Sequence, residues 1–97
     1  MIKSSLVEAI AKKNPNINSK NIEQMLNILL EEITNALIYG RRVELRGFGT
    51  FAVKKRIARL RRSPYNKKVM PIQEKWIPFF RSGKNLKERL NENYNPK

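Results

Sequence analysis

Two hydrophobic periods follow one another along the chain, first a helical period and then a strand period. In the first segment Ser5 followed by Glu8 fits a capping box, which predicts a helix that begins at Ser5 or slightly earlier. The apolar stripe of this helix consists of Leu6, Val7 and Ile10. The segment Asn14–Asn16, with a proline at its centre, ends it.

A longer apolar stripe predicts a second helix. Its members recur at helical spacing and are Ile22, Met25, Leu26, Leu29, Ile33, Ala36 and Leu37. Asn18 or Ser19 can cap the start of this helix, and Gly40 supplies the left-handed residue that ends it. Ile28 and Leu30 lie off the stripe and widen the apolar face.

From Arg41 onward the period changes to two. Val43 and Leu45 point to one side of a half-buried strand, and the three residues between and around them point to the other. These three are Arg42, Glu44 and Arg46. A turn over Gly47–Gly49 leads to a second strand with Phe51 and Val53 on its apolar side.

The last third of the chain predicts one more strand and a short helix. Trp76–Phe80 has a strand-like composition, and Pro78 suits an edge strand because proline cannot donate to a sheet ladder. Leu86 and Leu90 share one face of a helix that opens at Ser82–Lys84. Residues 92–97 are predicted to be a disordered tail.

The apolar surface is large for a single domain of 97 residues. The broad face of the second helix and the aromatic cluster exceed what two short strands and a small helix can cover. The members of that cluster are Phe48, Phe51, Trp76, Phe79 and Phe80. A partner subunit would cover this surface, and we therefore favour a dimer over an ordinary monomeric core.

Composition narrows the function. The net charge of +13, from 21 basic and 8 acidic residues, points to a polyanionic partner such as nucleic acid. With no His, no Cys and only scattered Glu, the chain has no catalytic constellation, so we predict no enzymatic activity, no cofactor and no metal. No apolar run is long enough to span a membrane, and the N-terminus lacks a secretory core, which makes a soluble intracellular protein the default.

The stretch from Arg46 to Gln73 concentrates the positive charge, with nine Lys or Arg and no acidic residue. Such a segment repels itself and predicts an extended arm that lies on a polyanion. A charge run is more often a solvated face, but the lack of interspersed acids argues against that interpretation. Pro64 lies in the middle of the stretch, where it is either a turn residue or an exposed apolar wedge.

The sequence resembles the bacterial HU and integration host factor proteins from Lys3 to about Asn91. The resemblance rests on Arg46–Phe51, on the cations around Pro64, and on Pro78–Phe80 followed by Ser82–Leu86. Within that family, Arg42–Arg46 is most similar to the beta subunit of integration host factor, because HU proteins usually carry an uncharged residue where Arg46 stands.

The resemblance implies a fold and a function. The fold is an α+β intertwined dimer with a helical body, a three-stranded antiparallel sheet and a long β-ribbon arm at about residues 55–74. The function is that of an architectural protein that bends duplex DNA through the minor groove, in recombination, transcription regulation and nucleoid organisation. The expected partners are double-stranded DNA and either an alpha-like subunit or a second copy, in the nucleoid of the bacterial cytoplasm.

The resemblance also implies a set of DNA-binding residues. Pro64 would insert between base pairs, and Glu44 would hold the guanidiniums of Arg42 and Arg46, so that Arg46 would respond to the width of the minor groove. The phosphate-binding cations would be Lys3, Lys54, Lys55, Arg56, Arg59, Arg61, Arg62, Lys67, Lys68 and Lys84. Without the resemblance, Lys3 and Lys84 are ordinary surface residues, and Arg42–Arg46 is equally well an exposed salt-bridge ladder.

The arm tip departs from the family pattern. Arg61 and Lys67 replace two glycines of the family's usual run, Ser63 replaces its asparagine and Asn66 its threonine. These changes alter the turn that presents Pro64, while the two added cations would contribute phosphate contacts.

Three other functions are alternatives. One is an HU-like homodimer with little sequence preference, which affinities for several duplexes would distinguish. Another is a basic RNA-binding or ribosomal protein, which charge alone would favour and a preference for bent B-form DNA would exclude. An enzyme is the third.

Overall fold

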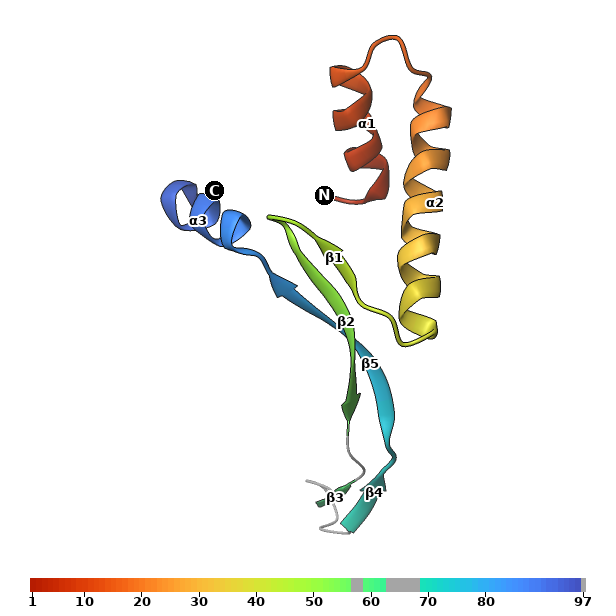
Figure 1. Ribbon diagram of the computed structural model, residues 1–97, viewed down its shortest axis with the longest axis vertical. Coiled ribbons are helices and arrows are strands. Elements are labelled where there is room, and N and C mark those ends of the chain that lie inside the picture. Colours follow the sequence, from red (N-terminus) through yellow and green to blue (C-terminus); the bar gives the residue numbers. More distant parts are fainter. Residues whose placement is uncertain (57–58, 63–68, 97) are drawn as a thin grey trace. The chain divides into compact units, whose positions relative to one another are not determined.

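The computed structural model describes the backbone of residues 1–56, 59–62 and 69–96, and the side chains of residues 1–56 and 73–96. The chain divides into two compact units, Met1–Asn35 and Ala36–Lys97. The first unit is helical, and the second contains the sheet and the last helix (Figure 1).

The first helix, α1, spans Lys3–Lys13 and begins two residues before Ser5, in agreement with the predicted start at Ser5 or slightly earlier. Ile2 is the N-cap and has no side-chain capping bond, while its carbonyl accepts a hydrogen bond of 3.1 Å from the Leu6 amide. The capping box predicted from Ser5 and Glu8 is therefore wrong, because Ser5 already lies inside the helix, where its hydroxyl is not at a capping position.

The second helix, α2, spans Ser19–Ile38, and both of its predicted ends are confirmed. Asn18 Oδ1 accepts a hydrogen bond of 2.8 Å from the Lys20 amide, which satisfies one of the free amides of the first turn. At the other end Gly40 has a φ of 74°, and the Arg41 amide donates to the Ala36 carbonyl at 2.9 Å. This is the Schellman arrangement that a left-handed glycine permits.

The sheet has three antiparallel strands in the order β1-β2-β5. Their bounds are Val43–Leu45 for β1, Gly49–Arg56 for β2 and Lys75–Ser82 for β5. β5 is an edge strand, a position that suits Pro78 because proline cannot donate to a sheet ladder, as expected. Together with three helices, this sheet confirms the predicted α+β fold class.

The turn between β1 and β2 is joined to the start of α3, which spans Lys84–Asn93. Gly47 has a φ of 84°, a left-handed conformation that glycine adopts without strain. The Gly47 carbonyl accepts from the Leu86 amide at 3.1 Å, and the Phe48 carbonyl accepts from the Gly83 amide at 2.8 Å. α3 ends two residues inside the segment 92–97 that was predicted as a tail.

Two further strands form a separate antiparallel ribbon within the predicted arm. β3 spans Arg59–Arg62 and β4 spans Val69–Ile72, with Arg59 opposite Ile72 and Arg62 opposite Val69. Figure 1 shows β2 and β5 running side by side towards this ribbon.

Few apolar side chains are buried. In the part of the chain with described side chains, Val7 and Ile22 are the buried apolar residues, with 8% and 4% of their surface exposed. The large apolar side chains that are 40% or more exposed include Met25, Ile28, Leu29, Leu30, Phe48, Trp76, Phe79 and Phe80. A partner subunit was predicted for this reason, and the dimer itself stays a prediction.

Candidate nucleic-acid interface

The register between β2 and β5 assigns each side chain to one of two faces of the sheet. Residues directly opposite one another in an antiparallel pair share a face, and successive residues alternate. One face carries Thr50, Ala52, Lys54 and Arg56 of β2 opposite Arg81, Phe79, Ile77 and Lys75 of β5. We call this the cationic face. The other, the packing face, carries Phe51, Val53 and Lys55 opposite Phe80, Pro78 and Trp76.

Aromatic rings contact one another on the packing face. The Phe80 ring lies 4.8 Å from the Phe51 ring and 5.5 Å from the Phe48 ring, measured between centroids. These rings are tilted against one another, as aromatic pairs in protein interiors usually are. Phe48, Phe51 and Phe80 therefore pack against one another, whereas Phe79, another member of the predicted aromatic cluster, lies on the cationic face.

The cationic face gathers exposed positive charge from three segments. Its exposed cations are Arg42, Lys54, Arg56, Lys75 and Arg81. A hollow of about 390 Å³ opens on this face between β1 and β5, and its lining includes Arg42, Glu44, Phe79 and Arg81. Several cations on one face produce a positive potential that attracts a phosphate backbone more strongly than isolated cations do.

Glu44 is the acidic residue of β1 on this face, opposite Thr50. Its carboxylate lies 3.9 Å from the Arg42 guanidinium, and both side chains are more than 60% exposed, at 73% and 67%. An exposed pair at this distance contributes little to stability, so Glu44 leaves Arg42 available to another anion. Among the described residues, the ion pair of Glu44 is with Arg42, whereas Arg46 shares with Glu44 the lining of a second hollow.

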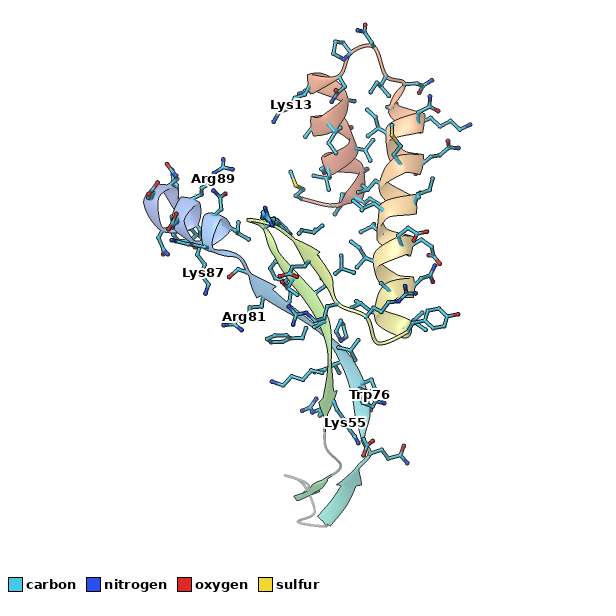
Figure 2. All side chains as sticks on the ribbon, in the orientation of Figure 1. Lys13, Lys55, Trp76, Arg81, Lys87 and Arg89 are labelled. Carbon is cyan, nitrogen blue, oxygen red and sulfur yellow. The ribbon has the colours of Figure 1, made fainter. Side chains whose placement is uncertain are left out.

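Lys55 differs from its neighbour Lys54 in its surroundings. The Lys55 ammonium lies 2.9 Å from the Glu74 carboxylate and 5.6 Å from the centre of the Trp76 ring. Figure 2 shows Lys55 beside Trp76, whereas Arg81 lies on the opposite side of the β2–β5 pair. That Lys55 binds DNA stays a prediction. Because Lys55 lies on the packing face, we expect it to contribute less to DNA affinity than Lys54.

Lys3 and Lys84 both lie outside the sheet. Lys3 donates from its ammonium to Asn27 Oδ1 at 2.8 Å, and because this acceptor is a neutral amide the charge of Lys3 is not compensated by it. Lys84 is the first residue of α3, its side chain is 90% exposed, and its ammonium lies 3.9 Å from the Glu88 carboxylate. The Gly83 and Leu86 amides at this end of α3 donate to the turn, so these two amides are not available to a phosphate.

The remaining predicted DNA-binding residues belong to the arm. Arg59, Arg61 and Arg62 lie on β3, where the described part is the backbone. Pro64, Lys67 and Lys68 lie outside the described residues, so their roles stay predictions.

Sequence reasoning missed Lys75, Ile77, Phe79 and Arg81 as members of this surface. The available signal was the strand period of β5, which places residues 75, 77, 79 and 81 on one face. Which face that is depends on pairing with β2, more than twenty residues away, and no local pattern indicates that register.

Other kinds of site have no support in the described ranges. No group of three or more His, Cys, Asp or Glu side chains in that part of the chain is placed to hold a metal. None of the described helices has the length and apolarity to cross a membrane. Duplex nucleic acid is the ligand that best suits an exposed, cationic sheet face of this kind.

Comparison with known proteins gives matches over almost the whole chain. Residues 1–91 match the model of a family described as bacterial DNA-binding protein. HU of Anabaena, solved as a cocrystal with DNA, is 33% identical with a TM-score of 0.85, and the match covers 96% of this chain and 100% of that one.

Two further solved structures are similar. HU of Thermotoga maritima is 31% identical with a TM-score of 0.66, covering 93% of this chain and 98% of that one. A mutant of transcription factor 1 is 25% identical with a TM-score of 0.62, covering 96% of this chain and 93% of that one.

Proposed function

Because this chain belongs to the bacterial DNA-binding protein family, that of HU and integration host factor, we propose that it is an architectural protein that binds and bends duplex DNA. The observation that carries this proposal is the one-sided arrangement of the sheet. Five exposed cations lie on the cationic face, while the ring-to-ring contacts of Phe80 with Phe48 and Phe51 lie on the other. Such a surface binds the phosphate backbone without reading base sequence directly.

The functional form would be a dimer. The exposed apolar residues of α2 and of the packing face support this, because a second subunit would remove them from water. The partner is either a related subunit, as in integration host factor, or a second copy of this chain, as in HU.

Bending would come from the arm. We propose that Pro64 inserts between base pairs at the arm tip, where its apolar ring, without an N–H, enters a base step and leaves no donor unpaired. The cations of β3 and of the tip, including Arg59 and Arg62, would hold the arm in the minor groove by neutralising phosphates. In the cell such a protein would associate with the bacterial nucleoid and act in recombination and transcription regulation.

Two forms of the function differ in sequence preference. Arg42, Glu44 and Arg46 support a protein similar to the beta subunit of integration host factor, because an arginine held at the groove responds to groove width. Similarity to HU of Anabaena and of Thermotoga maritima supports binding with little sequence preference. Affinities for duplexes with and without narrow A-tract grooves distinguish the two, since only the first form would prefer the narrow groove.

The test of bending uses energy transfer between dyes at the two ends of a duplex. The parent protein is expected to bring the ends together. Pro64→Ala is expected to reduce the bend substantially but to weaken affinity for straight duplex only modestly, because phosphate contacts dominate affinity. Full bending by the variant would show that Pro64 is a turn residue, and absence of bending by the parent would overturn the proposed function.

A further inference from the structure

The cationic face contains an apolar strip that phosphate binding does not explain. Phe79 and Ile77 are 43% and 38% exposed on the same face as Lys54 and Arg81, and Ala52 lies directly opposite Phe79. The Lys54 ammonium lies 5.3 Å from the centre of the Phe79 ring. The aromatic contacts of the packing face are made by other phenylalanines, and Phe79 takes no part in them.

When the cations on both sides of the apolar strip bind phosphates, the strip itself faces the part of the duplex that lies between those phosphates. In a duplex, the sugars lie between successive phosphates along each wall of the minor groove. When cations bind the phosphates, they fix the position of the protein along the backbone. Side chains between those cations then face the sugars.

Deoxyribose and ribose present different surfaces to such a strip. Deoxyribose offers C–H groups, whereas the ribose of an RNA strand displays a 2′-hydroxyl in the minor groove. Covering that hydroxyl with a phenyl ring would remove it from water without giving it a hydrogen-bond partner, which is unfavourable.

The uncharged polar groups and the acidic group near the strip lie towards one end of it. Thr50 lies opposite Arg81, and Glu44 lies beyond Thr50 on β1. From Ala52 and Phe79 to Ile77 the cation of this face is Lys54, which the proposed function assigns to a phosphate, and the other side chains are apolar, so a 2′-hydroxyl over the Phe79 ring meets carbon.

We propose that Phe79, supported by Ile77 and Ala52, is a specificity-determining contact that selects deoxyribose over ribose. This inference rests on the proposed function, because it requires the cationic face to bind a duplex. It assigns a role to the apolar residues of that face, whereas the proposed function used the cations and Pro64.

The test compares three duplexes of one sequence: DNA, a DNA–RNA hybrid, and the same hybrid with 2′-fluoro in place of the 2′-hydroxyl. The two hybrids have the same sugar pucker and differ in the hydroxyl group. The parent is expected to bind the hydroxyl hybrid about tenfold more weakly than the fluoro hybrid, which corresponds to about 1.4 kcal/mol for one unpaired hydroxyl.

Phe79→Asn is expected to abolish this tenfold ratio, because the amide can hydrogen-bond to the hydroxyl. Phe79→Leu is expected to keep it. Trp76→Asn is the matched control, since Trp76 is also an exposed aromatic residue of β5, at 67%, but lies on the packing face. This control is expected to leave the ratio unchanged. Should Phe79→Asn fail to fold by circular dichroism, Ile77→Asn carries the same expectation.

Failure of the inference and failure of the proposed function give different results. If the parent binds DNA but discriminates the two hybrids no better than Phe79→Asn does, the inference is wrong and the proposed function stands. The inference is also wrong if Trp76→Asn reduces the ratio as much as Phe79→Asn. If the parent binds no duplex, both are wrong.

Discussion

Because the sheet has two different faces, we predict that neutralising one cation on each face changes DNA binding by different amounts. Arg81 lies exposed on the cationic face, and Lys55 lies on the packing face beside Glu74. Arg81→Gln and Lys55→Gln each remove one positive charge per subunit. Any difference between the variants therefore reports the position of the charge and not the net charge.

The magnitude follows from counterion release. If a dimer neutralises about eight phosphates, the logarithm of the binding constant falls against the logarithm of salt concentration with a slope of about −7. If the partner is a second copy of this chain, Arg81→Gln removes two of these contacts per dimer and flattens the slope by about 1.8. Between about 50 and 200 mM salt, the parent then loses about four powers of ten in affinity and the variant about three.

Lys55→Gln is expected to leave this slope within about 0.5 of the parent, because the Lys55 ammonium is 2.9 Å from the Glu74 carboxylate and faces away from the bound phosphates. Fluorescence anisotropy of a labelled duplex at five salt concentrations measures each slope, after circular dichroism has shown that the variants fold. Equal flattening by the two variants would refute the assignment of faces. An unchanged slope for Arg81→Gln would remove Arg81 from the interface.

Two further predictions concern stability. The first is measured by thermal unfolding at two protein concentrations, and the second by unfolding at one fixed concentration. A hundredfold dilution removes about 2.7 kcal/mol from an obligate dimer and should lower its melting temperature by about 5–10 °C; a constant melting temperature would indicate a stable monomer. Gly49→Ala should destabilise by about 3 kcal/mol, because its Cβ would lie 2.5 Å from the Phe80 ring and 2.6 Å from the Arg81 carbonyl. Gly40→Ala should destabilise by only about 1–2 kcal/mol, since φ is positive but no atom lies within 4 Å; a larger loss than for Gly49→Ala would contradict this reasoning.

Features fixed by neighbouring residues were predictable from the sequence. The Asn18 cap and the Gly40 ending of α2 are local, and both are confirmed. The strand period likewise placed Arg42 and Glu44 on one side of β1, where the structure has them beside the same hollow. The start of α1 agrees with the predicted one, but its capping box does not form, because the N-cap is Ile2, whose carbonyl accepts the first helical bond.

Features that depend on distant pairing were not predictable. The strand period of β2 places Lys54 and Lys55 on opposite faces, but it does not show which of the two faces carries the other cations. Arg81 and Phe79 join Lys54 only through the register of β5 on β2. The apolar strip on the cationic face could therefore be found only in the structure.

The same register makes some residues necessary for binding although they do not contact DNA. A shift of one residue between β2 and β5 would move every side chain of β5 to the opposite face, so that Trp76 would replace Ile77 among the cations. Gly49 allows the observed register, because the Phe80 ring occupies the space where any side chain at position 49 would lie. The bond of 2.8 Å from the Gly83 amide to the Phe48 carbonyl fixes the end of β5 against the turn. Substitutions at Gly49 are therefore expected to weaken DNA binding through the position of Arg81, even in variants that remain folded.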